Sequence, residues 1–132
     1  MEKNGTGKIS AWLPVLFWMA VIFGLSAMEG HDIRPFDLFY FIERKAFHVI
    51  EYFILGVLAY RAFSQNISLK RALLFSSVLT LLYAASDEWH QTFVFGRTGT
   101  PRDVAIDAFG IFLAAFFILK YKQWKEKKQE SN

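Results

Sequence analysis

Four apolar stretches separated by short polar segments dominate this chain of 132 residues. They run from about Ile9 to Ser26, His48 to Phe63, Ala72 to Ala85 and Val104 to Tyr121. A helix needs about 20 apolar residues to cross roughly 30 Å of hydrocarbon, and each stretch approaches that length once flanking residues are added. The sequence therefore predicts an all-α fold. We expect a single domain over residues 1–132, an integral membrane four-helix bundle with helices at about 9–26, 45–63, 70–91 and 103–121.

The composition excludes several classes of function. The chain contains no cysteine, so disulfides, thiolate nucleophiles and Cys-ligated zinc are excluded. Its net charge of +3 comes from Lys and Arg beside the apolar stretches, and nucleic acid is not an expected partner. The first stretch follows Lys3 and Lys8, but no clear small-residue cleavage pattern follows it. We expect a retained helix rather than a signal peptide.

Basic residues are distributed unequally between the two ends of the predicted bundle. The end with both termini carries ten of them: Lys3, Lys8, Arg61, Lys70, Arg71, Lys120, Lys122, Lys125, Lys127 and Lys128. The other end carries five: Arg34, Arg44, Lys45, Arg97 and Arg102. The positive-inside rule then predicts that both termini are cytoplasmic. We expect a multi-pass protein of the bacterial inner membrane, whose basic tail, residues 120–132, can touch anionic lipid head groups.

Acids and histidines show the opposite bias. Nine of the twelve acids lie toward the second end: Glu29, Asp32, Asp37, Glu43, Glu51, Asp87, Glu88, Asp103 and Asp107. All three histidines, His31, His48 and His90, lie there too. Acids hardly influence topology, and ionisable groups at a membrane boundary are costly unless they are paired. The bias predicts a polar site on the extracytoplasmic face.

Helical spacing predicts which of these side chains meet. Lys45, His48, Glu51 and Tyr52 are three or four residues apart and form one face of the second helix. In the third helix, Asp87, His90 and Gln91 are expected to share a face, with Glu88 turned about 100° away.

The fourth helix is expected to begin near Thr100-Pro101. Asp103 and Asp107 lie one turn apart and face the same way. Gly110 and Ala114, with Ala108 and Ala115 nearby, offer small surfaces for close helix packing.

Carboxylates and histidines that converge at a membrane edge suit general acid–base chemistry. A histidine beside a carboxylate is held in one tautomer and can abstract a proton. The candidate catalytic residues are His48, Glu51, Asp87, Glu88, His90 and Asp103. The candidate substrate-binding residues are Lys45, Tyr52, Gln91, Arg97, Arg102 and Asp107, among which the arginines can grip a phosphate or carboxylate. The structural alternative is that Asp and Arg pair across the helix ends and only hold the loops.

No cofactor is predicted, and a divalent metal is a lesser alternative. His48, Glu51, His90 and the aspartates are suitable ligands, but Asp-Glu-Trp-His is not a His-Glu-x-x-His zinc helix. A serine nucleophile is less favoured still, because Ser86 lacks a Gly-x-Ser-x-Gly context.

The stretch Ser86-Asp87-Glu88-Trp89-His90-Gln91-Thr92-Phe93, with Gly96-Arg97 and then Asp103 and Gly110, resembles the VanZ-like family of small membrane proteins. The family pattern reads D-E-x-x-Q-x-F-x-x-G-R and then D-x-x-x-N-x-x-G. Lys45, His48 and Tyr52 resemble its second-helix motif, and Phe23-Gly24-Leu25-Ser26 resembles the end of its first helix. One departure is Asp107, which stands where the pattern has Asn. A second carboxylate beside Asp103 requires a proton on one of the pair or a cation between them.

The resemblance implies a multi-helix inner-membrane protein linked to resistance to the glycopeptide teicoplanin, and it implies no particular reaction. We therefore expect an extracytoplasmic site that binds or acts on an envelope lipid head group or a lipid-linked precursor. One alternative is a non-catalytic protein that binds a lipid, a glycopeptide or another envelope partner. Another is a small transporter, which is less favoured because no ionisable residue marks the middle of the first or third helix.

Overall fold

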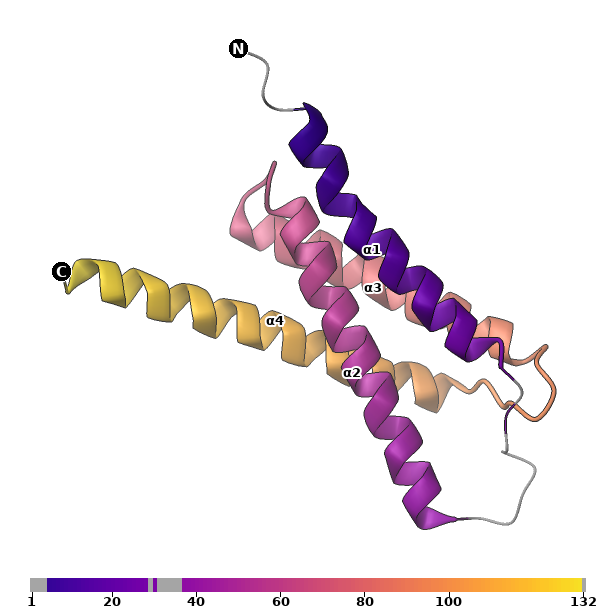
Figure 1. Ribbon diagram of the computed structural model, residues 1–132. Helices are drawn as coiled ribbons and strands as arrows, with labels where there is room; N and C mark the ends of the chain where they lie inside the picture. Colours follow the sequence, from indigo (N-terminus) through magenta and orange to yellow (C-terminus); the bar gives the residue numbers. More distant parts are fainter. Residues whose placement is uncertain (1–4, 29, 31–36, 132) are drawn as a thin grey trace.

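The computed structural model describes residues 5–28, 30 and 37–131. They form four helices: α1 (Gly5–Ser26), α2 (Leu38–Phe63), α3 (Leu69–Gln91) and α4 (Pro101–Glu130) (Figure 1). The predicted all-α, four-helix fold is confirmed. Polar residues of the first loop that were noted in the sequence, Glu29, His31, Asp32 and Arg34, lie outside the described residues.

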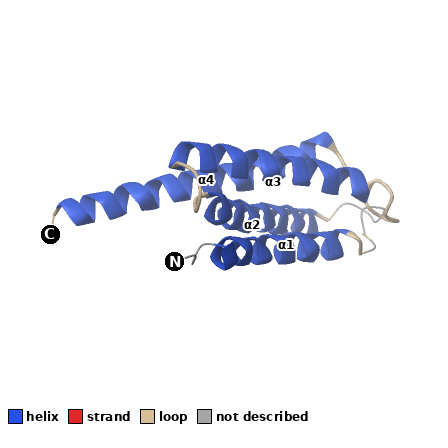
Figure 2. Cartoon of the chain, turned by 90° about the horizontal axis from the view of Figure 1, so that it is seen from above, coloured by secondary structure: helices blue, strands red, loops and turns tan. Residues whose placement is uncertain are grey.

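The helices are arranged in two layers. Seen from above, α1 and α2 lie in one layer, and α3 and α4 lie in the other (Figure 2). The C-terminal ends of α1 and α3 meet the N-terminal ends of α2 and α4 at one end of the bundle (Figure 1). The polar first turns of α2 and α4 thus lie at the same end of the bundle as the polar last turn of α3. We call this the polar end of the bundle.

Helix α2 begins at Leu38, seven residues before the predicted start of the second helix at residue 45. The predicted start did not take account of the N-cap at Asp37 or of the aromatic run that follows it. Asp37 is the N-cap of α2, and its Oδ1 accepts hydrogen bonds from the backbone N–H groups of Phe39 (2.9 Å) and Tyr40 (3.3 Å). Two amides that lack helical partners are satisfied in this way, and α2 gains two turns.

Helix α4 has the expected entry at Thr100-Pro101 and is longer than predicted at its C-terminal end. It begins at Pro101, where Thr100 caps the helix and a proline at the first position costs no hydrogen bond. It continues to Glu130 rather than ending at residue 121. The added residues are mainly Lys, Gln and Glu, which are good helix formers, and Lys127 and Lys128 complement the dipole at the C-terminus. The basic tail is therefore helical and projects beyond the other helices (Figure 2).

Small residues let α2 and α4 cross closely, as the sequence predicted for Gly110 and Ala114. A Cβ on Gly110 would collide with the carbonyl oxygen of Val49, and a Cβ on Gly56 would lie 3.0 Å from the Cβ of Ala114. The other two predicted residues, Ala108 and Ala115, lie instead in a shallow groove between α3 and α4. The close crossing brings the polar residues of α2 within reach of Asp103 and Asp107.

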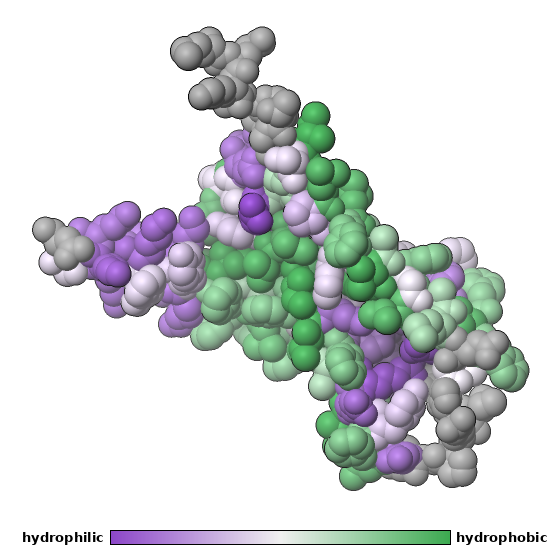
Figure 3. Space-filling view, in the orientation of Figure 1, coloured by the Kyte–Doolittle hydropathy of each residue, from purple (hydrophilic) through white to green (hydrophobic). Residues whose placement is uncertain are grey.

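All four helices are long and apolar enough to span a membrane. Their outward surfaces carry many exposed aromatic side chains, among them Phe17, Phe112 and Phe117. The space-filling view shows apolar residues across the middle of the molecule, with hydrophilic residues near the polar end and along the tail (Figure 3). At about 1.5 Å per residue, the 30 residues of α4 extend about 45 Å, which exceeds the hydrocarbon thickness.

Candidate functional site

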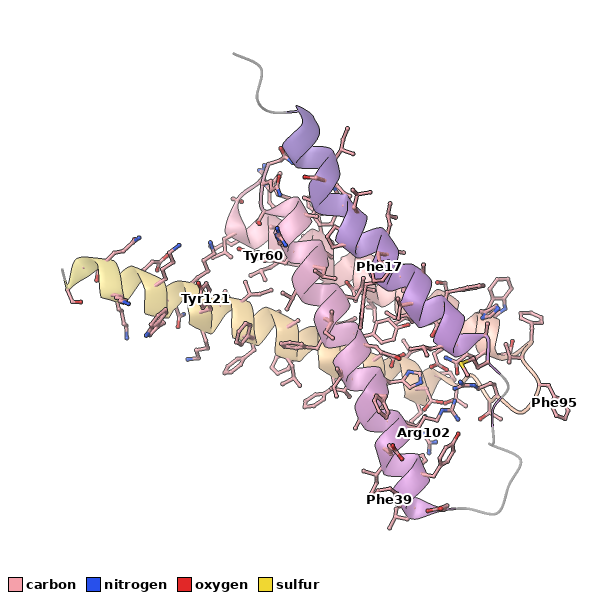
Figure 4. The ribbon with its side chains drawn as sticks, viewed as in Figure 1. Phe17, Phe39, Tyr60, Phe95, Arg102 and Tyr121 are labelled. Atoms are coloured by element: carbon pink, nitrogen blue, oxygen red, sulfur yellow. The ribbon has the colours of Figure 1, made fainter. Side chains whose placement is uncertain are left out.

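A cavity of about 400 Å³ lies at the polar end, between α1, α2, α3 and the loop that follows α3. We call it the polar pocket. Its walls combine carboxylates, arginines and apolar side chains: Ile22, Leu25, Ser26, Met28, Tyr40, Glu43, Arg44, Phe47, His48, Glu51, Asp87, Gln91 and Arg97. Side chains crowd this end of the bundle, whereas Phe39 and Phe95 point outward from its rim (Figure 4).

His48, Glu88 and Asp107 form a buried group of ionisable side chains, which we call the His48 cluster. The Nδ1 of His48 lies 3.0 Å from Asp107 Oδ1 and 3.8 Å from Glu88 Oε1. The three residues come from α2, α3 and α4, and all are buried. His48 also lines the polar pocket, so one member of the cluster reaches the cavity while the two acids lie behind it.

Asp87 belongs to a second group of hydrogen bonds between α2 and α3. Its Oδ2 accepts hydrogen bonds from the hydroxyl of Tyr52 (3.2 Å) and from Nε2 of Gln91 (3.1 Å). Gln91 Nε2 also lies 3.4 Å from Glu88 Oε1, and Gln91 Oε1 accepts from Nη2 of Arg44 at 3.4 Å. Gln91 is fully buried and thus connects the pocket wall to the His48 cluster.

Asp103 is held at the start of α4 by two partners. Lys45 forms an ion pair with Oδ1, and the hydroxyl of Thr100 lies 2.9 Å from Oδ2. The backbone N–H of Thr100 lies 3.3 Å from Glu88 Oε2. Asp103 and Asp107 do face the same way along α4, as predicted. They do not share a partner among the described contacts, because Lys45 serves one and His48 the other.

Arg97 ties the loop after α3 to the end of α1. Its Nε and Nη2 donate to the carbonyl oxygens of Met28 (3.1 Å) and Leu25 (3.0 Å). The backbone N–H of Gly30 also donates to the carbonyl oxygen of Phe95 (3.1 Å). The turn needs Gly96, whose φ of 71° is unfavourable for other residues. These contacts close the polar pocket on the side of α1.

The sequence model of the VanZ/LLP1 family matches residues 11–122, which covers most of the chain and the whole of this site. The chain belongs to the VanZ/LLP1 family. This membership confirms the resemblance to VanZ-like proteins and, with the four apolar helices, makes the chain a multi-pass membrane protein. No curated protein and no solved structure matches it.

Most of the candidate residues of this VanZ-like protein lie together. The polar pocket, the His48 cluster and the contacts around Asp103 bring together Lys45, His48, Glu51, Tyr52, Asp87, Glu88, Gln91, Arg97, Asp103 and Asp107. Two candidates lie apart from them. Arg102 is exposed, with its guanidinium 5.6 Å from the ring centre of Phe41 (Figure 4). The ring of His90 lies against Phe23 of α1, with centres 4.6 Å apart.

His90 was expected to share a face with Asp87 and Gln91, but it does not line the pocket as they do. Glu88 lies on a different face of α3 from Asp87, as predicted, and that face is buried as well. The reason is that α3 contacts both α2 and α4, so two adjacent faces of α3 point inward. Asp87 faces Tyr52 of α2, and Glu88 faces Asp107 and Thr100.

Sequence reasoning missed several pocket residues of this VanZ-like chain. Arg44 was counted only as a flanking charge, although it precedes His48 by one helical turn and therefore faces the same way. Glu43 and Tyr40 were missed because α2 was predicted to start too late. Ser26 was interpreted as a helix-end residue, whereas its Oγ is buried in the pocket wall and has no hydrogen-bond partner within the described part of the chain.

The arrangement has two chemical capabilities. The pocket offers hydrogen-bond donors and acceptors beside apolar side chains, which suits a polar group attached to a hydrocarbon chain. The His48 cluster offers one nitrogen and two carboxylates, which can exchange protons or hold a metal ion.

Proposed function

We propose that this VanZ-like protein binds the head group of an envelope lipid, or of a lipid-linked envelope precursor, in the polar pocket. In this proposal the protein lies in the bacterial inner membrane with both termini in the cytoplasm, so that the pocket opens on the extracytoplasmic face. The excess of Lys and Arg at the terminal end of the bundle supports this orientation.

The mixed lining of the pocket is the observation that carries the proposal. Arg44 and Arg97 can interact with an anionic phosphate, while Glu51, Asp87 and Gln91 can accept from hydroxyl or amino groups. A head group that joins a phosphate to hydroxyls or an amine would satisfy both sets. An ionised group this close to hydrocarbon is costly unless its partner is also present, so a ligand with both kinds of group fits best.

The apolar wall of the pocket supports a lipid rather than a free polar solute. One side of this wall consists of Ile22 and Leu25 of α1, with Met28 just after the helix. Phe47 of α2 lies on the other side. These side chains would contact the first methylene groups of an acyl or isoprenoid chain. At about 25 cal/mol per Å² of apolar surface buried, even a short hydrocarbon segment would add measurably to affinity.

Acid–base catalysis at the same site is a second candidate function. His48 favours it, because this residue lines the pocket while its Nδ1 lies 3.0 Å from a buried carboxylate. That contact would orient the imidazole and leave Nε2 to exchange a proton with a bound head group. We propose no specific reaction.

The test of head-group binding is to identify the lipids that remain with the purified protein. Native mass spectrometry of wild type released from bacterial membranes should show a lipid with a phosphate-containing head group. Glu51→Gln, which keeps the size of a pocket side chain and removes its charge, should reduce that occupancy. The matched control is Glu126→Gln on the exposed tail of α4, which should retain the lipid.

The link to glycopeptide resistance follows from the proposal and is tested in cells. If the protein alters or sequesters an envelope lipid, its expression in a susceptible bacterium should raise the inhibitory concentration of teicoplanin. Glu51→Gln should lose that effect at unchanged membrane abundance. The same lipid occupancy in wild type and in Glu51→Gln would refute the pocket as the binding site.

A further inference from the structure

The His48 cluster combines one imidazole nitrogen and two carboxylates on three different helices. One ligand atom from each of its three residues lies within 4.8 Å of the others. Two ligands on one first-row metal ion are typically about 3 to 3.5 Å apart, given metal–ligand bonds of about 2.0 to 2.2 Å. Small side-chain rotations that move these ligand atoms by up to about 1 Å would bring all three within bonding distance of a single ion.

Asp107 provides a second, independent observation. Its side chain is fully buried, and its Oδ2 has no hydrogen-bond partner among the residues that the structure describes. A buried carboxylate oxygen is rarely left unsatisfied, because the loss of hydration costs about 1–3 kcal/mol or more for a charged group. The oxygen lies in the same carboxylate that contacts His48, so a ligand bound between the three side chains would satisfy it.

The balance of charge in the His48 cluster also favours a bound cation. Glu88 and Asp107 are both buried and can carry two negative charges, while His48 supplies at most one positive charge. Of two nearby cations on α2, Lys45 forms its ion pair with Asp103, and Arg44 donates to the side chain of Gln91. Buried charges are retained in proteins when they are paired or coordinate a metal. A divalent cation would balance both carboxylates at once.

We propose that His48, Glu88 and Asp107 bind a divalent transition-metal ion between α2, α3 and α4. The imidazole ligand suits Zn²⁺ and the two carboxylates also suit Mn²⁺, whereas Mg²⁺ and Ca²⁺ prefer oxygen ligands throughout. Three protein ligands leave at least one position on the ion for water or for another ligand. The metal-binding nitrogen is Nδ1 of His48, so binding releases any proton held there.

This inference does not depend on head-group binding. The ion would lie behind the polar pocket, and of its three ligands only His48 lines the cavity. A protein that binds the metal and no lipid would support this inference and refute the proposed function. Binding of lipid without metal would support the proposed function and refute this inference.

The test is to measure metal bound to the purified protein. Wild type stripped with a chelator and then exposed to Zn²⁺ or Mn²⁺ in the presence of excess Mg²⁺ should bind one ion per chain, by calorimetry and elemental analysis. His48→Ala, Glu88→Gln and Asp107→Asn should each weaken binding by more than the roughly 10- to 100-fold typical of outer-shell changes. Two matched controls, His90→Ala outside the cluster and Glu126→Gln on the exposed tail of α4, should retain the ion.

A spectroscopic measurement on wild type keeps the proposal testable even if a variant fails to fold. Electron spin echo envelope modulation of the Mn²⁺-loaded protein should show coupling to a single histidine nitrogen, which changes when histidine is labelled with ¹⁵N. If neither Zn²⁺ nor Mn²⁺ binds at one ion per chain, the proposal is overturned. Binding without nitrogen coupling, or binding that survives loss of His48, would also overturn it.

Discussion

His48 on α2 and Asp107 on α4 are joined by a buried contact of 3.0 Å between Nδ1 and Oδ1. Breaking a buried charged pair by removing one partner typically costs about 3–5 kcal/mol, because the other partner stays buried without compensation. Asp107→Ala should therefore lower the free energy of unfolding by about that amount. Asp107→Asn should cost clearly less, because its amide oxygen can still accept from His48. Equilibrium unfolding of the detergent-solubilised protein measures both. Equal losses in the two variants would show that the contact contributes little.

Gly110 sets how closely α2 and α4 approach. A methyl group there would collide with the backbone carbonyl of Val49, and backbone cannot rotate out of the way as a side chain can. We expect Gly110→Ala to destabilise the protein by about 1–3 kcal/mol, the usual range for overpacking. The control is Gly24→Ala on α1, where a Cβ has no neighbour within 4 Å. It should be neutral or slightly stabilising, because Ala is the better helix former. Thermal unfolding of both variants makes the comparison.

Arg97 should control the mobility of the end of α1. Arg97→Gln removes the guanidinium that donates to the carbonyl oxygens of Leu25 and Met28. Hydrogen exchange in the last turn of α1 should then become faster, while exchange in the middle of α2 stays unchanged. Arg102→Gln is the matched control, since Arg102 is exposed and its described contact is with the ring of Phe41. If the two variants exchange alike, Arg97 does not hold α1.

The orientation of the bundle can be tested because the chain contains no cysteine. We expect Thr98→Cys, in the loop at the polar end, to react with a membrane-impermeant maleimide in intact cells. Gln65→Cys, in the loop at the opposite end, should react only after the membrane is made permeable. Both native residues are exposed, so access to the reagent decides the result. The reverse pattern would place the polar pocket on the cytoplasmic side.

The number of helices and the location of the polar end could be predicted from sequence, because both depend on where apolar runs stop. Membrane thickness fixes the length of such a run, and the acids collect at one boundary. Helix ends were less predictable. The two added turns of α2 depend on Asp37 acting as an N-cap, and an aromatic run after that residue fits either a helix or an interfacial segment.

The site was only partly predictable for a different reason. Spacing along one helix shows which side chains share a face, and it correctly grouped Lys45, His48 and Tyr52. It does not show how many neighbours a helix has. The sequence placed Glu88 on a different face of α3 from Asp87 but could not show that this face packs against α4. The pairing of Asp107 with His48 likewise emerged only from the packing of α2 against α4.

The loop after α3 has a consequence for ligand size. Arg97 fixes the last carbonyls of α1, and α1 supplies one wall of the polar pocket. The opposite walls belong to α2 and α3, which Tyr52 and Asp87 connect. The C-terminal end of α1 is thus held by the loop after α3, whereas the opposite walls are joined by a direct helix-to-helix contact. A substitution in this short loop can change the width of the cavity, and so the range of molecules admitted, without altering the three-helix core that holds the carboxylates in place.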